Sequence, residues 1–203
     1  MDNNETMRRV RWALSLDDAA AARAMTVGGV ATSGERAAAW RLRDGERGAE
    51  PCPDEALSAL LAGIVRERRG PDPRGEAVAP GGGARRMDNN AVLKALRIAL
   101  GLRGEDIVEI VREGTAAGGP RAVPAPTLSV AEVGSLLRRP GARNYRRCGD
   151  QVLRRFLNGL GARLRHDAHG DPGAAARPGA THVAGGAEAD GPGDATDAVG
   201  AGR

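Results

Sequence analysis

The chain has 203 residues, of which 41% are hydrophobic and 2% aromatic, with 30 Lys+Arg against 26 Asp+Glu. This length allows one or two small globular units and excludes a large enzyme core. No stretch reaches the roughly 18 apolar residues of a membrane-spanning helix, and residues 1–5 lack the basic and apolar character of a signal peptide, so we expect a cytoplasmic protein with no membrane partner.

Residues 1–69 have the apolar periodicity of a repeat of four short helices. The opening helix carries apolar residues at i, i+3 and i+7, on one face: Met7, Val10 and Leu14. Second and third helices are predicted at residues 17–25 and 33–43, and the pair Gly28-Gly29 ends the second. The closing helix has an i, i+3, i+4, i+7 face made of Leu57, Leu60, Leu61 and Ile64.

Residues 70–86 differ in composition, with three prolines and the run Gly81-Gly82-Gly83, and we predict a flexible linker. The glycine run follows no strand pattern and lacks the Gly-Lys-Ser/Thr ending of a phosphate-binding loop.

Residues 87–166 repeat the first segment, which indicates a tandem duplication. An offset of 86 aligns Met7, Val10 and Arg11 with Leu93, Leu96 and Arg97. Further along, an offset of 96 aligns Cys52, Asp54 and Leu57 with Cys148, Asp150 and Leu153. The difference falls in the Gly/Pro-rich residues 114–126, as expected of a loop that tolerates insertion. In this copy we predict the middle helices at residues 104–113, ended by Gly114, and 129–137.

The residues from 167 onward are dominated by Gly, Ala, Pro, Asp and Thr, and cannot offset the entropy of ordering. No period-two alternation indicates a strand. We therefore expect an all-α protein in which two homologous four-helix repeats, residues 1–69 and 87–166, pack as a pseudo-twofold pair. Residues 70–86 are the predicted linker, and residues 167–203 a disordered acidic tail.

No catalytic or metal-binding constellation is visible in the sequence. Cys52 and Cys148 are too few for a disulfide scaffold and lack the spacing of a zinc site. A thiol near a helix N-terminus is compatible with reactive chemistry. The three histidines, His166, His169 and His182, lie at the end of the second copy or in the tail, which leaves no Cys–His pair inside the fold. We expect no catalytic residues, no cofactor, no metal and no enzymatic activity.

Short polar residues at the helix starts are instead interpreted as caps. Asp2 with Asn3, and Asp88 with Asn89, are natural N-caps of the opening helices. Before each closing helix, a cysteine in the N-cap position is followed two residues later by an acid. The predicted caps are Asn3, Asn89, Cys52, Asp54, Cys148 and Asp150.

Trp12 and Trp40 lie on predicted helical faces where the second copy has Ile98 and Leu136. Exchange between apolar side chains of different size favours core filling over stacking on a ligand.

The charge of the two copies has diverged. Residues 1–69 hold 11 positive and 11 negative side chains, whereas residues 87–166 hold 14 and 7. An arginine-rich stretch contains Arg138, Arg139, Arg143, Tyr145, Arg146, Arg147, Arg154 and Arg155. Such a cluster next to a helix N-terminus can hold phosphates of a nucleic acid. Two other interpretations stay open: a solvated surface in an arginine-rich chain, and a surface against which the acidic tail lies.

The repeated NNxxxRxxRxAL/NNxxxKxxRxAL and C-x-D-x-x-L-x-x-[LF]-L-x-G motifs resemble the YehS-like family of bacterial proteins (domain of unknown function 1456), which occurs as two tandem copies. The resemblance covers residues 1–69 and 87–166. It implies a small cytosolic bacterial protein and brings no reaction, cofactor or partner. The enlargement at residues 114–126 and the long tail depart from the family pattern.

Duplication without a catalytic constellation leads us to expect a non-enzymatic binding or adaptor protein. Its binding surface would lie between the repeats and its partner would be a macromolecule, with a protein as the first hypothesis. The alternative is nucleic-acid binding through the arginine-rich face of the second repeat.

Overall fold

The computed structural model describes residues 1–70, 87–116 and 128–169. Residues 71–86 of the predicted linker, most of the Gly/Pro-rich loop, and the predicted tail from residue 170 lie outside the described residues.

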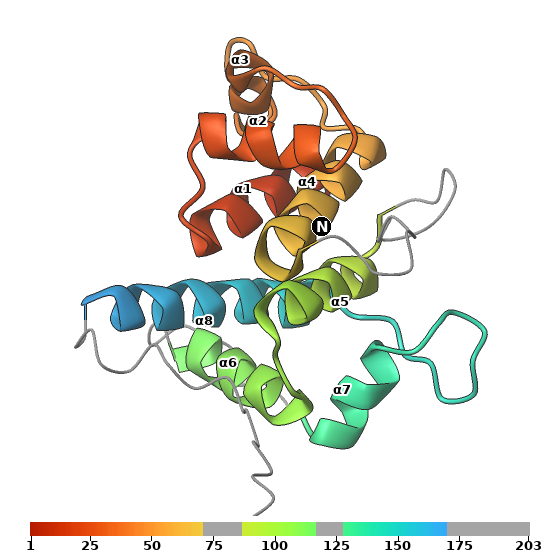
Figure 1. The fold of residues 1–203 in the computed structure, drawn as a ribbon. Coiled ribbons are helices and arrows are strands. Elements are labelled where there is room, and N and C mark those ends of the chain that lie inside the picture. The colour runs from red at the N-terminus through yellow and green to blue at the C-terminus, as the bar shows by residue number, and fades with distance from the viewer. Residues whose placement is uncertain (71–86, 117–127, 170–203) are drawn as a thin grey trace, which may run out of the picture.

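The described residues form eight helices and no strand (Figure 1). The first repeat contains α1 (Asn3–Ala13), α2 (Asp18–Val27), α3 (Gly34–Ala39) and α4 (Asp54–Arg69). The second contains α5 (Asn89–Leu100), α6 (Gly104–Ala116), α7 (Val130–Leu136) and α8 (Asp150–His169). The predicted all-α class and the two homologous four-helix repeats are confirmed.

The opening helix of each repeat packs mainly on the closing helix of the other repeat. α1 packs more extensively on α8 than on α4, and α5 more extensively on α4 than on α8. Figure 1 shows α8 running beneath α1 and α5. Within a repeat, α2 packs on α4 and α3 on α2, while α6 packs on α8 and α7 on α6. Exchanging the two repeats reproduces the same set of helix pairs, which is the signature of pseudo-twofold packing.

Glycines allow the second and fourth helices of each repeat to cross at backbone contact distance. A Cβ added to Gly63 would lie 1.7 Å from the Ala24 carbonyl oxygen, and one added to Gly159 would lie 1.9 Å from that of Ile110. Gly114 has the same function in α6, because its added Cβ would lie 1.8 Å from the Arg155 carbonyl oxygen. The prediction that Gly114 ends the helix is wrong: α6 continues to Ala116, since this glycine serves close packing.

Two other predicted helix ends also differ from the structure. α3 stops at Ala39, before the predicted residue 43, and the carbonyl of its C-cap residue Trp40 accepts a hydrogen bond from the Asn4 side chain. α8 continues to His169 and so includes three residues assigned to the tail.

The buried apolar residues form one core that runs through both repeats. It includes the predicted faces of the opening and closing helices, with Met7, Leu60, Leu93 and Leu157 each 0% exposed. Burying a side chain of this size contributes roughly 1.5–3 kcal/mol. The shared core therefore makes each repeat depend on the other for much of its stability.

Candidate functional site

The paired asparagines of the sequence motifs hold the loop before the closing helix. Asn4 is 8% exposed and donates from Nδ2 to the carbonyls of Trp40 and Glu50, at 3.1 and 2.7 Å. Its Oδ1 accepts from the Cys52 N–H at 2.8 Å. In the second repeat the same three bonds join Asn90 to Leu136, Arg146 and Cys148, at 2.7, 2.8 and 2.9 Å. These bonds satisfy buried backbone groups, which makes the motif structural.

The neighbouring asparagines join the helix starts to one another. Asn3 donates to the Cys52 carbonyl at 3.0 Å and to Asp54 Oδ1 at 2.8 Å. Asn89 makes the same bonds to Cys148 and Asp150, at 3.0 and 2.8 Å.

The N-cap residues of α1, α5 and α4 each lie one position away from the predicted caps Asn3, Asn89 and Cys52. Asp2 and Asp88 are the N-caps, and their carboxylates accept from the backbone N–H groups of Glu5 and Ala91. Asn3 and Asn89 are therefore the first helical residues, free to bond across to the following loop. The N-cap position of α4 belongs to Pro53, with no side-chain cap. Cys52 precedes it and donates its N–H to Asn4, while Asp54 and Asp150 are the first residues of α4 and α8.

Both cysteines are buried free thiols. Burial raises the pKa of Cys52 and of Cys148 to about 12, and the charge of Asp54 adds to the effect at Cys52. Only the thiolate is a strong nucleophile. The surroundings of both cysteines therefore suppress thiol chemistry near neutral pH.

The arginine-rich stretch divides between a loop and a helix. Arg138, Arg139, Arg143, Arg146 and Arg147 are exposed on the loop between α7 and α8, together with the half-buried Tyr145. Arg146 pairs with Glu132 at 2.6 Å, and Arg138 donates to the Arg143 carbonyl. Arg154 and Arg155 are half-buried on α8.

Arg154 faces the first repeat. Its Nε and Nη2 donate to the two carboxylate oxygens of Glu5 on α1, each at 2.9 Å. The hydrogen bond from Arg154 is the largest cause that lowers the pKa of Glu5, to about 2, and Arg9 contributes as well. This bidentate pair ties α8 to α1 across the repeats, so its charge is already compensated within the fold.

The two tryptophans have different environments. Trp40 is 4% exposed, which confirms core filling at that position. Trp12 is 51% exposed, so the core-filling prediction is wrong there. Its ring lies over Gly161 of α8, where an added Cβ would be 2.5 Å from the ring, and Arg165 stacks 3.8 Å from the ring centre. The glycine leaves the ring room on the surface of α8.

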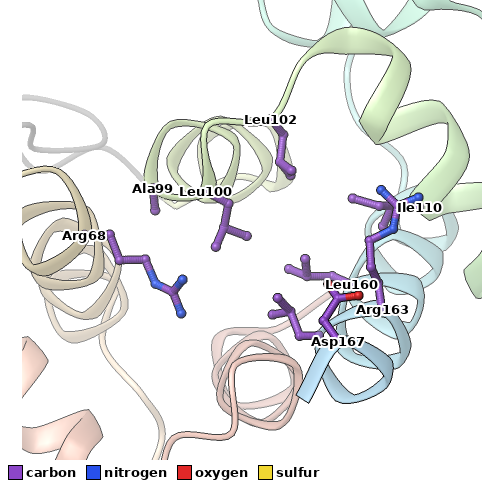
Figure 2. A pocket seen from close by; sticks show the side chains of 9 residues that line it. Arg68, Ala99, Leu100, Leu102, Ile110, Leu160, Arg163 and Asp167 are labelled. Carbon is purple, nitrogen blue, oxygen red and sulfur yellow. The ribbon is translucent and has the colours of Figure 1, made fainter. Parts of the chain in front are cut away.

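A cavity of about 420 Å³ lies where the two repeats meet (Figure 2). Its apolar wall is formed by Leu100, Leu102, Leu160 and Leu164 of the second repeat, together with Ala99 and Ile110. Ligand pockets in proteins commonly have this size and apolar character.

Three charged residues also line this cavity: Arg68, Arg163 and Asp167. Arg68 lies on α4 of the first repeat, and the other two lie on α8 of the second. Arg163 is held by Glu113 and Glu109, at 2.7 and 3.1 Å, and Asp167 lies on the same helix. Arg68 is exposed, reaches toward the open space in Figure 2, and forms no ion pair with any residue that the structure describes.

The sequence pattern places Leu100 and Leu160 on the apolar faces of the opening and closing helices, but it does not indicate a cavity between the repeats. The one available signal is that Arg68 and Leu164 occupy equivalent positions of the two closing helices, at the offset of 96. A charged residue and an apolar residue at matching positions indicate that the two faces have diverged.

Within residues 1–70, 87–116 and 128–169, no three His, Cys, Asp or Glu residues are grouped so that they could hold a metal ion. None of the described helices has the length and apolar character needed to cross a membrane.

Comparison with known proteins agrees with the duplication. The family model described as "Protein of unknown function (DUF1456)" matches residues 3–70 and 89–165, which correspond to the two repeats. The chain is 37% identical over 163 residues to "Uncharacterized protein YehS" of Escherichia coli (strain K12), an alignment that covers 80% of this chain and 96% of that protein. No solved structure matches the chain. Both repeats and most of the chain are thus accounted for by one family, and the protein belongs to the DUF1456 family.

Proposed function

We propose that this protein is a non-enzymatic adaptor that receives apolar side chains of a partner protein in the cavity between its repeats. The observation that carries this proposal is the cavity itself, to which Arg68 of the first repeat and leucines of the second both contribute. Interfaces gain most of their affinity where a partner's side chain fills such an apolar pocket. A cation beside the pocket favours a partner segment with an acidic residue next to an apolar one.

The lining favours binding over chemistry. Among the described residues that line the cavity, Asp167 is the single carboxylate, and none is a cysteine, serine or histidine. Nucleophilic catalysis uses an activated nucleophile such as serine, cysteine or lysine, and the lining contains none of these.

Affinity purification of the tagged protein, followed by mass spectrometry with and without nuclease, tests the proposal. We expect a co-purifying protein that is lost in Leu164→Asp, which places a charge in the cavity. The matched control is Val27→Asp, a change at an apolar residue that is 42% exposed at the end of α2, away from the cavity lining. Thermal unfolding of both variants verifies that they fold. Equal recovery with both variants, or no protein above background with the parent, contradicts the proposal.

A second candidate is nucleic-acid binding through the α7–α8 loop. Arg139, Arg143 and Arg147 are exposed there, and they form no ion pair with the described residues. The equivalent loop of the first repeat alternates its arginines with Asp44, Glu46 and Glu50. This difference in charge between matching loops favours a phosphate-binding role for the second repeat alone.

Salt dependence tests the second candidate. Contacts with three phosphates predict that the logarithm of the affinity for a duplex falls with that of salt at a slope of roughly −3. Arg143→Glu weakens binding, whereas Arg47→Glu, at the equivalent position of the first repeat, leaves it unchanged. Affinity that is independent of salt, or equal effects of the two variants, rules this candidate out.

A further inference from the structure

The first repeat contains a buried arginine with an internal carboxylate partner. Arg11 on α1 is 3% exposed, and its Nη2 lies 2.5 Å from Asp18 Oδ1 at the start of α2. Its Nη1 donates to the Ala37 carbonyl at 3.0 Å, and its Nε to that of Leu16 at 3.4 Å. Every nitrogen of the guanidinium therefore has a partner.

The second repeat keeps the arginine and lacks the carboxylate. Arg97 is equivalent to Arg11, but Gly104 stands where the first repeat has Asp18. Arg97 is half-buried and forms no ion pair with any described residue. Its Nε is buried with no hydrogen-bond partner in the described part of the chain. A buried donor without a partner is costly, and the cost is larger for a charged group.

The nearest acids in sequence do not replace the missing one. Arg103 stands in the place of Asp17, so the second carboxylate at this helix start is absent too. The carboxylate of Asp106 accepts from the Arg103 N–H at 2.6 Å, and neither it nor Glu105 pairs with Arg97.

We propose that the second repeat binds a carboxylate group at Arg97, in the position that the Asp18 carboxylate occupies beside Arg11. In the first repeat that position is open to solvent, since the side chain of Asp18 is 37% exposed, and Gly104 is itself half-buried in the second repeat. Gly104 has no side chain of its own to fill that position, and a terminal Nη group of Arg97 can donate to an incoming carboxylate, as Nη2 of Arg11 does to Asp18. Arg97 does not line the cavity between the repeats, so this carboxylate site is separate from the site of the proposed adaptor function.

An apolar neighbour narrows the class of ligand. Val130 is 46% exposed at the start of α7, and its Cγ1 lies 3.0 Å from the place of a Cβ on Gly104. In the first repeat a second arginine, Arg41, also pairs with Asp18, and the equivalent residue of the second repeat is Leu137. The ligand is therefore a single carboxylate with a small apolar group beside it. A short branched carboxylic acid and an acidic residue flanked by apolar residues in a partner peptide share this chemistry.

The test is a titration of the full chain, followed by ¹H–¹⁵N spectra that include the arginine Nε–H signals. The probes are isovalerate and the blocked tripeptide acetyl-Leu-Asp-Leu-amide, at constant ionic strength. Neutral isovaleramide is the control. We expect saturable shifts at the Arg97 Nε–H and at the Gly104 and Glu105 amides, and none with isovaleramide.

Gly104→Asp supplies the carboxylate within the chain, as Asp18 does in the first repeat. We expect this variant to lose the saturable shifts and to unfold at a higher temperature than the parent. Arg97→Gln removes the positive charge, so we expect this variant to lose the saturable shifts of the Gly104 and Glu105 amides. This result does not depend on whether Gly104→Asp folds. The matched gain-of-site variant is Asp18→Gly, in which isovalerate produces new saturable shifts around Arg11.

Saturation by isovalerate or by the tripeptide supports the site, and the tighter of the two identifies the source of the carboxylate. Shifts that fail to saturate with both probes overturn the proposal. Shifts that persist unchanged in Arg97→Gln overturn it as well.

Discussion

Gly63 lies where α4 crosses α2, and replacing it with alanine measures how tightly the two helices are held. The new Cβ would lie 1.7 Å from the Ala24 carbonyl oxygen, whereas C···O contacts are normally about 3.3 Å or longer, so the helices must separate by about 1.6 Å. Because the obstacle is backbone, no rotamer change relieves it. Overpacking of this kind costs about 3 kcal/mol, and the better helix propensity of alanine returns about 1 kcal/mol. We expect Gly63→Ala to lower the free energy of unfolding by about 2 kcal/mol.

Urea unfolding followed by far-ultraviolet circular dichroism provides the measurement. The control is Gly134→Ala, within α7, where an added Cβ would have no atom within 4 Å. That variant gains up to about 1 kcal/mol from helix propensity alone. Gly159→Ala, at the equivalent crossing of α6 and α8, should lose about as much as Gly63→Ala. A Gly63→Ala variant as stable as Gly134→Ala would refute the close crossing.

Three further predictions concern the polar groups of the fold. Asn90→Ala leaves two carbonyls and one buried N–H without their partner, so we expect the free energy of unfolding to fall by about 2–4 kcal/mol in urea titrations; a loss below about 1 kcal/mol contradicts this. Glu5 has its pKa lowered from 4.5 to about 2 in the folded state, so its contribution to stability is complete above about pH 4.5 and is lost as the pH falls toward 2. Urea midpoints in that pH window should fall less steeply for Glu5→Gln than for the parent, and equal slopes count against the pair with Arg154. Cys148, with its pKa raised to about 12, should react with thiol reagents at mildly alkaline pH only as fast as the protein unfolds, and rapid labelling of the native protein contradicts its burial.

The duplication and the helical class are readable from the sequence, because apolar residues at helical spacing recur in both copies. Leu57, Leu60 and Leu61 match Leu153, Phe156 and Leu157, and all six are buried. Such a face must pack against some other element, which is enough to predict a helical core.

The exchange of opening helices is not readable in the same way. The face of α1 that contains Met7 and Val10 fits a closing helix of either repeat by periodicity alone. The choice of α8 depends on contacts between residues far apart in sequence, such as the pair of Glu5 with Arg154. Trp12 lies against Gly161 of that partner helix, a contact that no pattern within α1 reveals.

The candidate sites depend on differences between equivalent positions. Gly104 in place of Asp18 is visible in the aligned copies, but it acquires meaning only once the structure shows Arg11 holding that aspartate. Likewise, the arginine-rich stretch is continuous in sequence, while the fold turns Arg154 toward α1 and leaves Arg143 exposed.

Separation of the two repeats tests the central claim, that each opening helix completes the other repeat. The measurement is urea unfolding of residues 1–70 and 71–203, expressed separately and then mixed. We predict that neither half unfolds cooperatively as a monomer, and that mixing produces a one-to-one complex with a cooperative transition. A half that unfolds cooperatively as a monomer, with the same midpoint alone as in the mixture, contradicts the exchange of helices between the repeats.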